Sequence, residues 1–102
     1  MRTFLFLYIA AVAAAAGAPH ARAQENTVAR SLAATCAGCH GTEGRSATKD
    51  VASLAGLPKA HIVSQMKAFK EGTRPATVMH QIAKGYTDPQ IEQLADYFAA
   101  KK

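Results

Sequence analysis

Apolar and polar positions divide the chain into one continuous apolar run and several amphipathic stretches. Residues 4–16 are apolar without a break. A stretch between Pro58 and Gly72 instead carries apolar residues at helical spacing, namely Ile62, Val63, Met66 and Phe69. Proline is tolerated in the first turn of a helix, and glycine commonly ends one. The pattern therefore predicts a helix that begins at Pro58 and ends at Gly72.

The clearest predicted helix lies at the C-terminal end of the chain. Thr87 and Gln90, three residues apart, have the spacing of a capping box, and Asp88 is an acid in the first turn. The apolar face that follows consists of Ile91, Leu94, Ala95 and Phe98. This face should pack against another helix.

Two further helical stretches complete the predicted fold. The first is capped by Asn26 or Thr27 and runs to about Thr35, with Val28, Ala29 and Leu32 on one face. The second is a short helical turn from Met79 to Lys84, closed by Gly85, after an irregular stretch containing Pro75. No segment alternates with period two, so the predicted fold class is all-α.

The N-terminal residues have the order of a secretory signal peptide. A short basic start, Met1-Arg2-Thr3, precedes the apolar run, and Ala21-Arg22-Ala23 then supplies small residues where a signal peptidase cleaves. Thirteen apolar residues fall short of the ~20 that span a bilayer as a helix. We therefore expect a signal peptide at 1–23 that is removed, a periplasmic location, no stable membrane anchor, and one domain at 24–102.

The expected mature chain is poor in large apolar residues. Only 17 of its 79 residues are Val, Ile, Leu, Met, Phe or Tyr, and none is Trp. A chain of this size usually needs a disulfide, a metal or another cross-link to hold its fold. Removal of Arg2 and Arg22 would lower the formal net charge of +5 by two, to +3. So weak a basic charge, without a cluster of basic and aromatic residues, does not indicate a nucleic-acid partner.

The strongest chemical signal is the segment Cys36-Ala37-Gly38-Cys39-His40. C-x-x-C-H is the attachment signature of c-type haem, in which two thioethers hold the porphyrin and the histidine binds the iron. A thioredoxin-type dithiol would need a βαβ pattern, which the sequence lacks. A structural zinc site would need four ligands, and the chain has no second cysteine pair. A structural disulfide would leave His40 unexplained. We therefore expect one covalently bound haem c.

The second axial ligand is chosen among four side chains, namely Met66, Met79, His61 and His80. Met66 belongs to an apolar stripe, where a thioether suits a protein core, and His61 should face solvent. Met79 follows an irregular stretch that can direct its side chain to the far face of the haem. A Met/His pair is a known axial set of cytochromes c, so Met79 is the predicted ligand, with His80 as its main rival.

The sequence resembles the short, monohaem class I cytochromes c over residues 26–100. The resemblance rests on the attachment motif, on Gly41 and Gly44 after it, on Ser53-Leu54-Ala55-Gly56, on Gln65, and on Leu94-Ala95-Asp96-Tyr97-Phe98. Residues 74–86 also resemble the cytochrome subunits of flavocytochrome c sulfide dehydrogenases. One position departs from the family, because Ala52 stands where a proline is usual, and the carbonyl of that residue accepts a hydrogen bond from the proximal histidine.

The resemblance implies three to five helices around one haem and a one-electron carrier that is not itself an enzyme. Redox proteins are the implied partners, among them a flavoprotein dehydrogenase of the sulfide dehydrogenase type. With both axial positions filled by protein, the iron has no open site for a substrate. The alternative is a haem enzyme or gas sensor with an open sixth position, which would require that Met79 does not bind.

Overall fold

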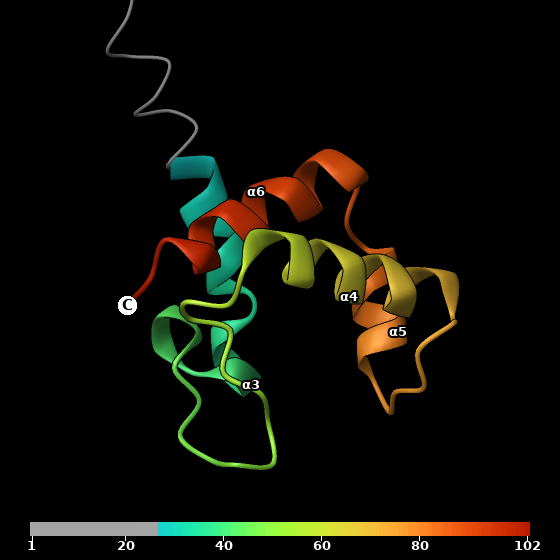
Figure 1. The fold of residues 1–102 in the computed structure, drawn as a ribbon, viewed down its shortest axis with the longest axis horizontal. Coiled ribbons are helices and arrows are strands. Elements are labelled where there is room, and N and C mark those ends of the chain that lie inside the picture. The colour runs from blue at the N-terminus through green and yellow to red at the C-terminus, as the bar shows by residue number, and fades with distance from the viewer. Residues whose placement is uncertain (1–26) are drawn as a thin grey trace, which may run out of the picture.

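The computed structural model describes residues 27–102, and every regular element in this range is helical (Figure 1). Residues 27–34 are helical and lead to α3 (Ala37–His40) and the short 3-10 helix η1 (Thr42–Gly44). The remaining helices are α4 (Lys59–Glu71), α5 (Met79–Lys84) and α6 (Asp88–Ala99). The predicted all-α class is confirmed.

The predicted signal peptide at 1–23 and the candidate cap Asn26 lie outside the described residues. Among residues 27–102, no helix has both the length and the apolar character needed to cross a membrane.

The helix ends follow the signals in the sequence. Pro58 occupies the N-cap of α4, and Gly72 ends that helix in the left-handed conformation with φ of 78°. At the start of α6, the backbone N–H of Gln90 donates to the Thr87 hydroxyl at 3.3 Å, and the backbone N–H of Thr87 donates to the Gln90 side-chain oxygen at 2.9 Å. The predicted capping box is confirmed.

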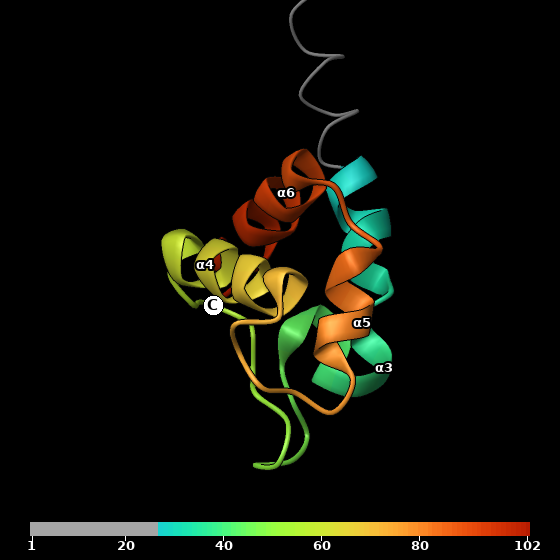
Figure 2. The ribbon, with the colours of Figure 1, turned by 90° about the vertical axis from the view of Figure 1, so that its right-hand side faces the viewer.

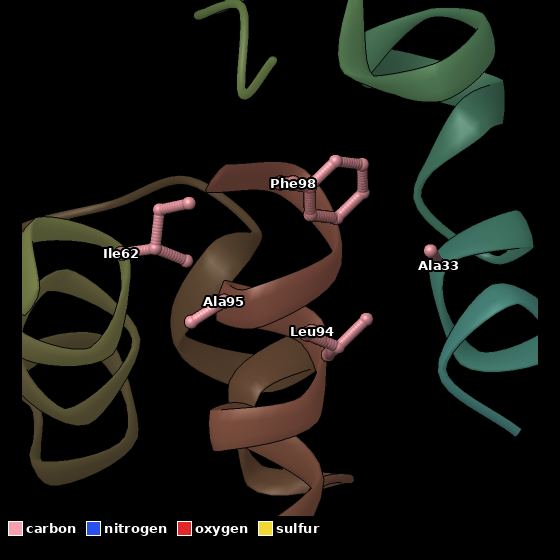
Figure 3. Packing of buried hydrophobic residues seen from close by; sticks show 5 residues of the cluster. All are labelled: Ala33, Ile62, Leu94, Ala95 and Phe98. Carbon is pink, nitrogen blue, oxygen red and sulfur yellow. The ribbon is translucent and has the colours of Figure 1, made fainter. Parts of the chain in front are cut away.

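Helix α6 lies at the centre of the packing (Figure 3). Ala95 points toward Ile62 on α4, while Leu94 and Phe98 point toward Ala33 in the helical stretch 27–34. These five residues form the buried cluster. Helix α4 also packs against α5, so α4 connects the central helix to the segment that begins at Met79.

The face predicted for the first helix is wrong at Val28. This side chain is 41% exposed, whereas Ala29 and Ala33 are buried and Leu32 is partly buried against the cluster. Small side chains at the contact let two helices approach closely, and the large residues Leu94 and Phe98 of α6 fill the volume from the other side. The helix also ends one residue earlier than predicted, and a turn at Thr35 and Cys36 separates it from α3.

The core of the described residues is small. Eight hydrophobic side chains are buried in residues 27–102, and four of them are alanine; the eight are Ala29, Ala33, Ile62, Ala83, Ile91, Leu94, Ala95 and Phe98. Alanine contributes little apolar area when it is buried. This agrees with the expectation that the mature chain has too few large apolar residues for a secure core of its own.

Candidate haem-binding site

Helix α3 brings the three residues of the attachment motif together. Cys36 is its N-cap residue, and its carbonyl oxygen accepts the backbone N–H of Cys39 at 3.3 Å and that of His40 at 2.9 Å. Residues three and four apart in a helical turn are neighbours on one face. The two cysteines are not joined by a disulfide. Two free thiols and one imidazole therefore extend from a single short turn.

A hydrogen bond fixes the orientation of the His40 ring. Its Nδ1 nitrogen lies 2.6 Å from the carbonyl oxygen of Ala52. A carbonyl can only accept, so Nδ1 carries the proton and donates it, which leaves the lone pair on Nε2. Metal-ligating histidines characteristically donate their other ring N–H in this way. His40 is thus in the tautomer that an iron ligand needs.

The loop after α3 holds Ala52 in place through Gly44. The carbonyl of Gly44 accepts the backbone N–H groups of Leu54 at 2.8 Å and of Ala55 at 3.2 Å. Ser53, next to Ala52, accepts the backbone N–H of Ser46 with its hydroxyl at 3.0 Å. The hydrogen bond expected from the proximal histidine is therefore present although alanine replaces the usual proline.

The surroundings of Cys36 favour a structural role over a redox thiol. Burial raises the pKa of the Cys36 thiol, and the neighbouring Thr35 hydroxyl, 3.9 Å from Sγ, opposes this only in part. Reactive dithiols need the opposite, a lowered pKa that yields a thiolate. Within residues 27–102, moreover, no three His, Cys, Asp or Glu side chains gather as a metal-ion site. Neither the thioredoxin-type reading nor the zinc reading gains support from this geometry.

Met79 is the first residue of α5 and follows the irregular stretch 73–78. It is half-buried, and its neighbours Val78 and Ile82 are apolar side chains exposed by 51% and 39%. Both views of the ribbon place α5 and α3 below α6; the two helices lie next to each other in projection in Figure 2 and are separated horizontally in Figure 1. The link between the two segments is the hydrogen bond of 2.6 Å between the hydroxyls of Thr35, which precedes Cys36, and Tyr86, which follows α5.

The three rival ligands have different environments. Met66 packs against the buried cluster, as expected for a core methionine, and His61 is exposed. His80 differs, because its Nδ1 is buried and has no hydrogen-bond partner. A buried polar atom without a hydrogen-bond partner is costly and calls for an explanation. His80 therefore remains the rival to Met79.

The residues present fit a haem. The side chains offered are two free thiols, an imidazole with its Nε2 lone pair directed by a backbone carbonyl, and a thioether from a second helix. The apolar side chains of Val78 and Ile82, on either side of Met79, are exposed. They offer an apolar surface that a haem ring would cover. The buried Nδ1 of His80 lies in the same helix.

One residue of the site region was not singled out by the sequence analysis. The Tyr86 hydroxyl lies 2.6 Å from the hydroxyl of Thr35, the residue before Cys36. Its side-chain type could have drawn attention to Tyr86, because a tyrosine in a packed segment usually has a hydrogen-bond partner for its hydroxyl.

A small all-α domain with C-x-x-C-H on a short helix, and a histidine oriented by a backbone carbonyl, defines a c-type cytochrome domain. The sequence of residues 25–100 matches the Cytochrome c family, and the chain belongs to that family. The predicted resemblance is confirmed, and so is the covalently bound haem c that the family carries.

The relatives of the chain include proteins named as cytochromes and a protein named as an electron acceptor of a dehydrogenase. The cytochrome subunit of sulfide dehydrogenase from Chlorobaculum tepidum is 43% identical over 67 residues, which cover 66% of this chain and 60% of that protein. Cytochrome c-554(548) from Halomonas halodenitrificans is 31% identical over 67% of this chain and 86% of that protein. A thiosulfate dehydrogenase electron acceptor from Stutzerimonas stutzeri is 33% identical over 63% of this chain and 31% of that protein.

The matched region spans less than two thirds of the sulfide dehydrogenase subunit and of the thiosulfate dehydrogenase acceptor. What is shared with these relatives is the cytochrome domain. The domain is an electron-transfer domain and not itself an enzyme, as predicted.

Proposed function

We propose that the protein is a periplasmic electron carrier with a single haem c, held by Cys36 and Cys39 and ligated by His40 and Met79. The observation that carries the proposal is the hydrogen bond from His40 Nδ1 to the Ala52 carbonyl at 2.6 Å. Such a bond prepares Nε2 for iron and strengthens the imidazole as a ligand. When bound, the haem supplies the one-electron chemistry.

The residues of the chain set the properties of that chemistry. The cysteine thioethers fix the porphyrin against α3, and the hydrogen bond at Nδ1 keeps the imidazole plane from rotating. Met79 would supply a thioether ligand from α5, and a Met/His pair raises the reduction potential. With both axial positions filled, substrate and oxygen have no place on the iron, which favours electron transfer over oxidase or sensor chemistry.

The relatives' names support a dehydrogenase as the electron donor. One relative is a cytochrome subunit of a sulfide dehydrogenase and another an electron acceptor for a thiosulfate dehydrogenase. We propose that this chain accepts electrons from a flavoprotein dehydrogenase of the sulfide dehydrogenase type. Delivery to the periplasm would use the signal peptide at 1–23, and the cytochrome domain would occupy 24–102.

The axial ligand is tested by two methionine variants of the matured, haem-loaded protein. We expect Met79→Ala to abolish the near-infrared charge-transfer band of thioether–iron ligation, to lower the reduction potential, and to let carbon monoxide bind the ferrous iron. Met66→Leu is the matched control, because it nearly conserves volume at a core position and should leave all three properties unchanged.

The two variants separate the competing ligand sets. Loss of the band in Met66→Leu, with retention in Met79→Ala, would overturn the assignment of Met79. A wild-type protein without the band that also fails to bind carbon monoxide would indicate a bis-histidine haem, with His80 or His61 as the second ligand. A wild-type ferrous protein that binds carbon monoxide readily would instead support the open-site enzyme or sensor.

A further inference from the structure

Tyr86 lies in the connection between α5 and α6 and is held at both ends. Its hydroxyl lies 2.6 Å from Thr35 Oγ1, across 51 positions of sequence. Its backbone carbonyl accepts a hydrogen bond from Lys70 Nζ of α4 at 2.8 Å. Its side chain is partly buried against the hydrophobic cluster. Three segments of the fold therefore meet at this residue.

Counting protons gives the direction of the bond between the two hydroxyls. The Thr35 hydroxyl has one proton, and its oxygen lies 2.7 Å from the carbonyl oxygen of Leu32, which can only accept. Thr35 therefore donates to Leu32, and Tyr86 donates to Thr35. In this arrangement every proton has an acceptor, and the chain of bonds ends on the last turn of the helical stretch 27–34.

Helix α5 and the turn that follows it connect Met79 to Tyr86. The backbone N–H of Gly85 donates to the carbonyl of Ile82 at 3.0 Å, and that of Tyr86 donates to Ala83 at 3.2 Å. Ala83, which lies between Met79 and Tyr86, is fully buried, so α5 and the turn after it are packed as one unit. From Met79 to Lys84 the helix rises only about 7.5 Å, at 1.5 Å per residue. A displacement at Tyr86 would therefore be passed to Met79.

We propose that Tyr86 is a positioning residue for the distal haem ligand, because its hydrogen bond to Thr35 ties the α5 segment to the residue that precedes Cys36. The inference rests on the proposed ligation by Met79. Among the helices between Ala37 and Ala99, α3 makes its main contact with η1, and α5 makes its main contact with α4. The Tyr86–Thr35 bond joins the two sides directly and limits how far Met79 can withdraw from the iron.

The test measures how readily imidazole displaces the distal ligand in the ferric, haem-loaded protein. Imidazole binds only when Met79 has left, so its apparent affinity is proportional to the open fraction. Tyr86→Phe removes one hydroxyl and keeps the ring. A hydrogen bond of ordinary net strength corresponds to about a five-fold change in such an equilibrium. We expect the apparent Kd for imidazole to fall about five-fold, with the thioether band still present without imidazole.

Four further variants make the result specific. Thr35→Val should reproduce the effect of Tyr86→Phe, and the double variant should add little to either single change, because both remove the same bond. Thr35→Ser retains a hydroxyl and should keep the wild-type Kd. Tyr97→Phe is the control for the loss of a tyrosine hydroxyl. Tyr97 lies on α6, where its ring contacts Phe98 and Lys101. This variant should leave imidazole binding unchanged.

The outcomes distinguish this inference from the proposed function. A wild-type thioether band together with an unchanged Kd in Tyr86→Phe overturns the positioning role and leaves Met79 as the ligand. Full additivity of the two single variants also overturns it, because the residues would then act independently. A merely structural role would lower the thermal midpoint without changing the Kd. Absence of the band in the wild type overturns the ligation by Met79 and this inference together.

Discussion

Ala52 shows that the hydrogen bond to His40 needs a backbone carbonyl at this position and does not need a proline. Any residue offers a backbone carbonyl, and that of Ala52 accepts the His40 Nδ1–H at 2.6 Å. Proline would restrict the backbone at this position. Here the restriction comes from the neighbours, because Leu54 and Ala55 donate to the carbonyl of Gly44. The stiffness of the loop is therefore distributed over backbone hydrogen bonds instead of residing in one ring.

Gly44 gives a prediction at the scale of the residue. Its φ is +78°, and a Cβ added there would lie 2.8 Å from Phe98 Cδ1 and 3.0 Å from the backbone nitrogen of Ala55. Gly44→Ala combines the left-handed backbone cost, roughly 1–2 kcal/mol, with an overpacking cost of roughly 1–3 kcal/mol. Guanidinium denaturation of the haem-loaded protein measures the sum.

Gly72→Ala is the matched control for that prediction. Gly72 has the same φ of +78°, but a Cβ there would meet no atom within 4 Å. It should lose only the backbone part, roughly 1–2 kcal/mol. Equal losses of unfolding free energy in the two variants would show that crowding of the added Cβ against Phe98 does not destabilise the Gly44→Ala protein.

At the scale of the element, the sequence predicts helices whose ends are determined locally. The capping box of α6 and the left-handed Gly72 of α4 involve residues within a few positions of each other, so their patterns suffice. The attachment motif on α3 is equally local. The His40–Ala52 bond was expected from the family resemblance, and its partner lies only 12 positions away.

The hydrophobic pattern of the sequence did not predict contacts between segments that are far apart in the chain. The predicted face of the first helix contained Val28, Ala29 and Leu32, yet Val28 is exposed, and the buried residues there are Ala29 and Ala33. The Tyr86–Thr35 bond spans 51 positions, and nothing in the sequence near either residue identifies the other as its partner. Such details depend on how the helices pack, and hydrophobic periodicity does not encode them.

Phe98 provides the prediction for α6. The ring is almost fully buried and packs edge-on against Tyr97, with 5.2 Å between the ring centroids. Phe98→Ala removes the one aromatic side chain among the five residues of the buried cluster and should cost roughly 3–5 kcal/mol of the free energy of unfolding. Denaturant unfolding followed by circular dichroism measures the loss.

Phe69→Ala is the control for aromatic burial. Phe69 is only half-buried on α4, and Arg74 stacks over its ring at 4.7 Å from the centroid. Its removal should cost clearly less than that of Phe98. A loss below about 1 kcal/mol for Phe98→Ala is incompatible with a ring buried at the helix contact.

At the scale of the whole molecule, exposed ion pairs connect different segments but add little to the stability of the fold. Glu43 pairs with Arg45 at 2.9 Å and with Lys101 at 3.2 Å, which connects η1 to the C-terminal end of the chain. The hydrogen bonds from Arg45 and Lys101 lower the pKa of the Glu43 carboxyl. Lys59 similarly joins α4 to α6 through Glu92 and Asp96. Solvent-exposed pairs of this kind contribute little to stability.

The haem should therefore decide whether the domain folds. Half of the buried hydrophobic residues in 27–102 are alanine, and the surface pairs cannot compensate for the small core. Changing both Cys36 and Cys39 to alanine removes the covalent attachment. We expect the haem-free double variant to be largely unfolded, with low helical ellipticity and rapid digestion by protease, because the apolar area that a haem buries has no replacement in the chain.

Two comparisons make that expectation decisive. The haem-loaded wild type should show a cooperative thermal transition and resist the same protease treatment. Wild-type apoprotein, which keeps both thiols, should behave like the double variant, so that loss of haem and loss of sulfur are separated. A cooperative thermal transition in the haem-free double variant would show that the polypeptide folds alone. The small core around α6 would then be sufficient, and the haem would act as a redox group inserted into a finished fold rather than as part of the core.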